Sequence, residues 1–196
     1  MKGKATDVFT TGMRRHCQAV EALAAQLDGL CEAAHMLVEC YKNRGKVLLF
    51  GNGGSAADAQ HIAAELMGKY YLSRAPLPAL ALTVNTSVLT AVANDYGFDR
   101  IFARQVQALG SPGDVAIAIS TSGRSPNVIS AVRCARQMGM GTIGLTSSDG
   151  EQLQSEARVC ICVPSSDTPR IQEGHILVGH LLCEFVEQEL FGSPDA

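Results

Sequence analysis

Five short, almost wholly apolar runs recur along the chain and alternate with longer segments of helical periodicity. A parallel strand that helices cover on both faces is a continuous apolar run of this kind. The runs are residues 47–50, 79–82, 115–119, 142–145 and 159–163. Helices are predicted at residues 55–69, 87–94, 99–109, 126–138 and 170–190. The alternation predicts an α/β fold, a three-layer αβα sandwich around a five-stranded parallel sheet with right-handed crossovers.

The first 43 residues predict a helical arm ahead of this core. Apolar residues recur at spacings of three and four from Phe9 to Leu30, which is the pattern of an amphipathic helix. Gly45 is predicted to end the arm in the left-handed conformation. Such an arm either packs across subunits or covers its own core, and the sequence leaves both alternatives open. No linker or repeat interrupts the 196 residues, so one domain is predicted, with an arm over 1–43 and an α/β core over 46–192.

Composition excludes several classes of partner and location. Sixteen basic and 19 acidic residues give a net charge of −3 with no long basic run, so neither nucleic acid nor a membrane is expected as a partner. No apolar run approaches the roughly 20 residues of a membrane span, and the N-terminus lacks the apolar core of a signal peptide. Seven cysteines without a Cys-x-x-Cys motif are typical of a reduced cytosolic protein, so a cytoplasmic location is predicted.

Two polar loops follow the first and third apolar runs, at the edge where open α/β sheets bind ligands. The first is GNGGS at residues 51–55, whose glycines allow close backbone approach and whose Ser55 is placed to cap the next helix. The second is STSGRSPN at residues 120–127, with four hydroxyl groups ahead of a helix start. Either loop alone is also typical of a plain turn. Two such loops at neighbouring strand ends predict a site for a phosphorylated small molecule.

Ionisable side chains lie close behind the first loop. His61 and Glu65 are four residues apart on the predicted helix and therefore share a face, where they can converge on one ligand or metal ion. His180 on the last helix lies among apolar neighbours, which predicts a half-buried ring. A surface ion pair and a structural histidine are the alternatives for these positions.

Four segments in this order carry a family resemblance: GNGGSAADAQH at residues 51–61, ANDYGF at 93–98, ISTSG at 119–123 and RIQEGH at 170–175. They resemble the phosphoheptose isomerases of the sugar isomerase (SIS) domain family. The resemblance covers nearly the whole chain and is weakest over the first 40 residues. It implies the flavodoxin-like SIS fold, and a homotetramer with active sites at subunit interfaces.

The activity that the resemblance implies is conversion of D-sedoheptulose 7-phosphate to D-glycero-D-manno-heptose 7-phosphate, the first step of bacterial ADP- or GDP-heptose biosynthesis. Moving a carbonyl from C2 to C1 requires removal of a proton beside the carbonyl and its return to the neighbouring carbon. One carboxylate can do this, and Glu65 is the predicted base. His180 suits proton transfer between the sugar oxygens, because imidazole titrates near neutrality.

Site residues are carried over from the resemblance position by position. Glu65 and His180 are the implied catalytic pair. The implied substrate-binding residues are Asn52, Gly53, Gly54, Ser55, Glu65, Asn94, Asp95, Ser120, Thr121, Ser122, Ser125 and Gln172. The implied metal ion is zinc, one per subunit, bound by His61, Glu65, Gln172 and His180. On a straight helix Gln172 and His180 are ~12 Å apart, so both reach one ion only if Gln172 lies on an irregular first turn.

Two other functions are compatible with such a fold. A non-catalytic regulator of the replication initiator-associating type resembles these isomerases but lacks the acid/base residues, and Glu65 and His180 argue against it here. An isomerase of another sugar phosphate remains open, because a pocket discriminates one extra hydroxymethyl group only modestly.

Overall fold

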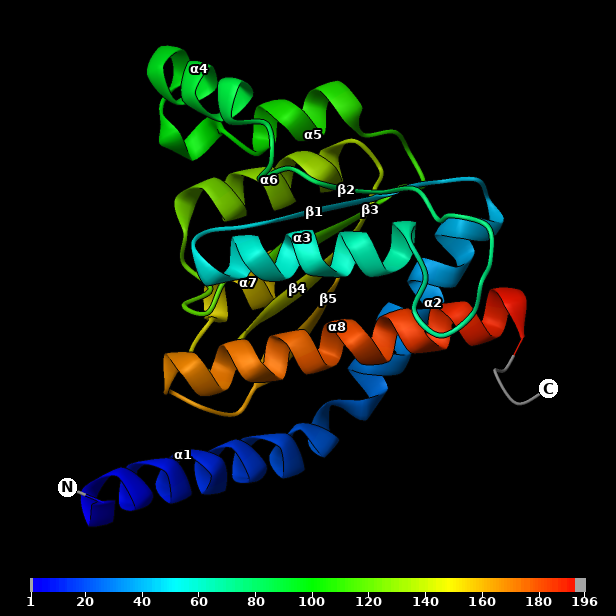
Figure 1. Cartoon of the computed structure of the whole chain (residues 1–196). Helices are drawn as coiled ribbons and strands as arrows, with labels where there is room; N and C mark the ends of the chain where they lie inside the picture. The colour runs from blue at the N-terminus through cyan, green and yellow to red at the C-terminus, as the bar shows by residue number, and fades with distance from the viewer. Residues whose placement is uncertain (1, 193–196) are drawn as a thin grey trace.

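The computed structural model describes residues 2–192 and confirms the five-stranded parallel sheet (Figure 1). Its strands are β1 (Val47–Gly51), β2 (Ala79–Ala81), β3 (Val115–Ile119), β4 (Gly141–Ser147) and β5 (Val159–Val163). They lie in the order β2-β1-β3-β4-β5, and each neighbouring pair is parallel. Strand β2 lies on one side of β1, and the chain then crosses to the other side of β1, where β3, β4 and β5 are added in order. The carboxyl ends of β1 and β3 therefore flank the switch point where such sheets bind ligands.

Helices cover both faces of the sheet, as predicted. They are α1 (Lys2–Leu23), α2 (Leu27–Lys42), α3 (Gly54–Met67), α4 (Thr86–Tyr96), α5 (Ala103–Leu109), α6 (Pro126–Gln137), α7 (Glu151–Glu156) and α8 (Thr168–Phe191). On one face α2, α3 and α8 pack on strand residues such as Leu49 and Ile117. On the other, α5, α6 and α7 pack on the alternating set, such as Leu48 and Ala116. Most strand side chains are thus covered, which explains the apolar runs, although Leu80 of the edge strand β2 is 39% exposed.

Three local predictions differ from the structure. The short helix α7 lies in a segment with no predicted helix, because six residues are too few to show a helical period. The helix predicted over 99–109 is a 3₁₀ turn, Phe98–Arg100, followed by α5. Gly45 is not the left-handed residue after α2: that conformation belongs to Arg44, with φ of 61°. Gly45 is needed instead for space, because a Cβ atom there would lie 2.7 Å from Cys40 Sγ.

The N-terminal arm is α1 followed by a 3₁₀ turn, Ala24–Gln26, and α2. Leu23 is buried against the core, whereas the Phe9 and Met13 side chains are 66% and 62% exposed. Helix α1 runs along the outer side of α8 (Figure 1), where Arg170 Nη1 donates a 2.6 Å hydrogen bond to the carbonyl of Gly12. Within residues 2–192 no helix is both long and apolar enough to cross a membrane.

Candidate active site

The loop after β1 turns sharply into α3 and is built on glycines. Gly53 has φ of 57° and ψ of −120°, and α3 begins at Gly54. At Gly51 a Cβ atom would lie 2.7 Å from the carbonyl oxygen of Ile119 on the adjacent strand, so only glycine fits there. Ser55 is 4% exposed and lies inside the first turn, so the predicted capping role is wrong. This loop, residues 51–55, is called the Gly-rich loop below.

The loop after β3, residues 120–125, is called the Ser/Thr loop below. The Oγ atoms of Ser120 and Ser125 are 3.1 Å apart, and the Arg124 amide donates to Ser122 Oγ at 3.3 Å. Gly123 has φ of 63° and packs on Gly150 so closely that a Cβ atom would overlap it. These contacts hold the loop in one shape.

Two side-chain amides join these loops. Asn52 Nδ2 donates to Asn127 Oδ1 at 2.9 Å, and Asn127 Nδ2 donates to Asn52 Oδ1 at 2.8 Å. Asn127 is 2% exposed, at the start of α6. Sequence reasoning missed this residue, because a single asparagine at a helix start carries no signal of a partner 75 positions away.

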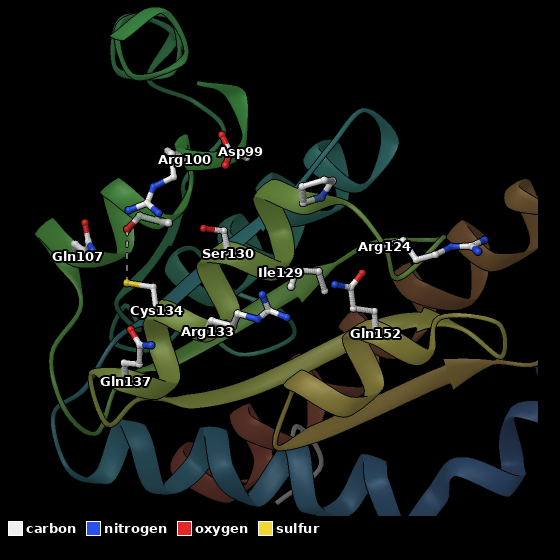
Figure 2. Close-up of a pocket in the computed structure, with 12 residues that line it drawn as sticks. Asp99, Arg100, Gln107, Arg124, Ile129, Ser130, Arg133, Cys134, Gln137 and Gln152 are labelled. Carbon is white, nitrogen blue, oxygen red and sulfur yellow. Dashed lines mark hydrogen bonds between the residues drawn. The ribbon is translucent and has the colours of Figure 1, made fainter. Parts of the chain in front are cut away.

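The Ser/Thr loop opens on two hollows. A cavity of about 180 Å³ is lined by Thr121, Ser122 and Arg124, together with Ser147 at the end of β4 and Ser166 from the loop beyond β5. A larger groove of about 450 Å³ lies over the outer side of α6, where Figure 2 shows Arg124 at one end and Arg100 at the other. Of the predicted hydroxyl residues, Thr121 and Ser122 line the smaller cavity, at the carboxyl edge of the sheet.

The second part of the site lies between α3 and α8, which run side by side in the same direction (Figure 1). The Nε2 atoms of His61 and His180 are 2.9 Å apart, and His61 Nε2 is 3.5 Å from Glu65 Oε1. The Glu65 side chain is 25% exposed and that of His61 is 48% exposed. His180 is half-buried, as predicted. The structure thus brings together three of the predicted residues, His61 and Glu65 of α3 and His180 of α8. His61 and His180 are 119 positions apart in the sequence.

The helices approach closely because Gly179 has no side chain. A Cβ atom at Gly179 would lie 2.5 Å from Cδ1 of Ile62. Tyr70, in the loop after α3, adds an aromatic ring 5.9 Å from that of His180. Burial raises the pKa of Tyr70 to about 12, so its hydroxyl keeps its proton at neutral pH. Sequence reasoning missed Tyr70, since one tyrosine in a polar loop carries no pattern.

Gln172 lies apart from this group. Its side-chain amide packs directly on Gly54 at the start of α3, whereas His180 lies two turns further along a continuous α8. The irregular first turn that would bring Gln172 to the histidines is absent from α8 as the structure describes it. Within residues 2–192, no group of three or more His, Cys, Asp or Glu side chains forms a complete metal site.

Asn94 and Asp95 also lie apart, on α4 at the far end of the molecule in Figure 1. Both are exposed, and Asn94 Nδ2 donates to Asp95 Oδ1 at 2.8 Å. Helix α4 has no buried residue. In one chain these two residues face solvent rather than the loops.

Buried ionisable groups frame the site. Burial lowers the pKa of His175 to about 4, partly offset by its hydrogen bond to the Thr146 carbonyl, so this ring is neutral and structural. Burial raises the pKa of Asp58, one turn before His61, and the His61 charge opposes that shift. Burial alone would raise the pKa of Glu187, but hydrogen bonds from three backbone amides and Arg74 lower it. Glu187 is therefore a buried carboxylate that stays charged.

Comparisons with known proteins fit this geometry. The family model of the SIS domain matches residues 9–147. A phosphoheptose isomerase of Citrifermentans bemidjiense is 52% identical over 180 residues, which cover 91% of this chain and 94% of the relative. One of Rhodospirillum rubrum is 57% identical over 182 residues, covering 91% and 97%. The solved structure of a phosphoheptose isomerase from Francisella tularensis superposes with a TM-score of 0.90 at 39% identity, covering 94% and 98%.

The fold, the loops at the switch point and the family model define a SIS-domain protein. Within this class, the sequence identity to the two phosphoheptose isomerases exceeds 50% over nine-tenths of the chain. The chain belongs to the phosphoheptose isomerase family.

Proposed function

We propose that this chain interconverts D-sedoheptulose 7-phosphate and D-glycero-D-manno-heptose 7-phosphate. The observation that carries the proposal is the convergence of His61 and Glu65, on the helix that begins at the Gly-rich loop, with His180 of α8. From Ser55 to His61 and Glu65 the helix rises by ~9 and ~15 Å. An extended seven-carbon sugar that is anchored by its phosphate at the loops spans the shorter of these rises, and the Glu65 side chain leans back toward the start of the helix to meet its carbonyl end.

Glu65 is the proposed base. It takes a proton from C1 of the ketose and returns it to C2, while the electron pair of the broken C–H bond passes into an enediol. His180 moves the accompanying proton from the C1 oxygen to the C2 oxygen, as an imidazole can near neutral pH. Glu65 suits this role because it is three-quarters covered, which excludes bulk water, yet remains reachable from the surface.

The loops hold the phosphorylated end of the sugar in this proposal. The proposed contacts are Asn52, Gly53, Gly54 and Ser55 of the Gly-rich loop, Ser120, Thr121, Ser122 and Ser125 of the Ser/Thr loop, and Gln172. Hydroxyl groups, amides and helix starts are suited to phosphate oxygens. The packing of Gln172 on Gly54 supports its place at this end.

Zinc is proposed as the metal. Its residues would be His61, Glu65 and His180, whereas Gln172, the further ligand that the resemblance implies, packs on Gly54 at the other end of the site. The donor set fits in kind, since two imidazole nitrogens and a carboxylate oxygen suit zinc. The two Nε2 atoms lie 2.9 Å apart, at hydrogen-bond distance, so the two imidazoles meet at one place. When bound, zinc supplies Lewis acidity toward the oxygens of the sugar.

A homotetramer with active sites between subunits is proposed for the assembly. The exposed Phe9 and Met13 on α1 support it, because apolar side chains two-thirds exposed are expected to be covered in an oligomer. Asn94 and Asp95 support it too, since they are substrate contacts only if a neighbouring subunit lies against α4. Light scattering that reports a stable monomer would exclude this assembly. The cytoplasmic location stays a prediction.

The function is tested by solvent-deuterium incorporation into the sugar phosphate. Glu65→Gln keeps the side-chain size but removes the base, so turnover and exchange are expected to fall by at least ~10²–10⁴-fold. Glu39→Gln, on the exposed part of α2, is the matched control and should keep full activity. Undiminished exchange in Glu65→Gln would show that another group is the base. A parent protein with no turnover of five-, six- or seven-carbon sugar phosphates would refute the enzymatic function.

A further inference from the structure

Asn127 connects the two loops of the site without being open to solvent. It lies at the start of α6, directly behind the Ser/Thr loop, and its amide faces Asn52 of the Gly-rich loop. These loops follow β1 and β3, which are adjacent strands. A small ligand that contacts both loops requires a fixed distance between them.

The Asn127 side chain has only one orientation that satisfies its hydrogen bonds. Its Oδ1 accepts from Asn52 Nδ2 and from the amide of Val128, both at 2.9 Å, and its Nδ2 donates to Asn52 Oδ1 at 2.8 Å. Rotation of the amide by 180° would place donors against donors, which is costly for a group that is 2% exposed. The pair is therefore rigid, and its orientation is set by the backbone of α6.

We infer that Asn127 is a positioning residue, which fixes Asn52 and with it the Gly-rich loop relative to the Ser/Thr loop, so that both contact the same sugar phosphate. The inference rests on the proposed function. Asn127 is too deeply buried to touch a ligand itself, whereas Asn52 is partly exposed at the mouth of the loop. A displacement of ~1 Å between groups that hold a substrate can lower the rate by about 10²-fold.

The test is a double-mutant cycle with Asn52→Ala, Asn127→Ala and the double variant. Asn127→Ala is expected to lower kcat/KM by about 10–10²-fold. In the Asn52→Ala background the same change is expected to have little further effect, because the residue through which Asn127 acts is already absent. Asn127→Asp should resemble Asn127→Ala, since it places an oxygen against Asn52 Oδ1. Asn43→Ala, at an exposed helix end, is the control and should leave kcat/KM unchanged.

Amide hydrogen exchange of residues 51–55 gives a second readout that needs no turnover. Exchange is expected to rise equally in Asn52→Ala, Asn127→Ala and the double variant. A role limited to the start of α6 predicts the opposite: faster exchange in α6 alone and additive losses of kcat/KM. That result would overturn the inference while leaving the enzymatic function intact. An inactive parent would refute the proposed function, and the exchange pattern would still decide the role of Asn127.

Discussion

The buried ion pair of Glu187 and Arg74 permits a sharp prediction. Both side chains are 2% exposed, and Arg74 Nε donates to Glu187 Oε2 at 2.9 Å. The same carboxylate accepts hydrogen bonds from the amides of Tyr70, Tyr71 and Leu72, at 3.1, 2.6 and 2.8 Å. It therefore folds the loop after α3 against α8. This loop carries Tyr70, whose ring lies beside His180.

Glu187→Gln replaces one acceptor oxygen by an NH₂ group that can only donate. Each carboxylate oxygen accepts two of the four hydrogen bonds. In either orientation of the new amide, its NH₂ group therefore faces two N–H donors that have lost their acceptor. The substitution also leaves the Arg74 charge without its partner. Removing one member of a buried pair costs about 3–5 kcal/mol. Because a whole domain is stable by only about 5–15 kcal/mol, the loss should be plain in a urea titration.

Glu184→Gln is the matched control, since Glu184 lies one turn earlier on α8 and accepts a 3.3 Å hydrogen bond from the exposed Gln188. It should change the free energy of unfolding by less than about 0.5 kcal/mol. Hydrogen exchange should rise at residues 70–72 in Glu187→Gln and stay constant in the control. A loss below about 1 kcal/mol in Glu187→Gln would show that water reaches the pair and that the loop is held by other contacts.

Three further outcomes are expected. Unfolded histidine binds a proton below its pKa of 6.5, whereas folded His175 does so only near pH 4. The free energy of unfolding should therefore fall by about 3 kcal/mol from pH 7 to pH 4. In His175→Gln, thermal melts across that range should show a smaller dependence of stability on pH. Ser55→Ala should weaken sugar phosphate binding by roughly 1–2 kcal/mol in titration calorimetry, and equal affinity would place the phosphate elsewhere. Metal analysis should find about one zinc per subunit in the parent and none in His61→Ala, whereas a metal-free parent with full activity would exclude zinc.

The sheet could be predicted from the sequence because its strands are buried on both faces. Where a strand is covered throughout, as at Val115–Ile119, each of its residues meets a helix, and composition alone marks the segment. The pairing of His61 with Glu65 was also accessible, since a four-residue spacing is a local property of a helix. Rules based on local sequence failed where a glycine is required because a side chain would not fit, and not because of its backbone conformation. Gly45 has the composition of a helix terminator, yet its neighbour Arg44 adopts the left-handed conformation.

The long-range contacts could not be predicted in this way. The contact of His180 with His61 depends on how α8 packs on α3, which is set by Gly179 against Ile62. No periodicity encodes that match, so the assignment of His180 came from a family resemblance. The same holds for the partners of Asn127 and Glu187, which lie more than 70 positions away along the chain. The partners of such groups can be identified only in the folded structure, where burial leaves each polar group one possible hydrogen-bond partner.

The parallel course of α3 and α8 divides the site into two ends. The packing that joins His180 to His61 also places Gln172 on Gly54, because α8 is continuous between them. In the proposed function, one end offers amides and hydroxyl groups to the phosphate, and the other offers a carboxylate and imidazoles to the carbonyl. Their separation is fixed by helix geometry at ~12 Å along α8, not by mobile loops. A sugar phosphate that is anchored at the first end must therefore be long enough to bring its carbonyl to Glu65. If the proposed roles hold, shorter sugars would be bound by the same loops but held away from Glu65, so the proposal predicts slower turnover of five-carbon than of seven-carbon sugar phosphates.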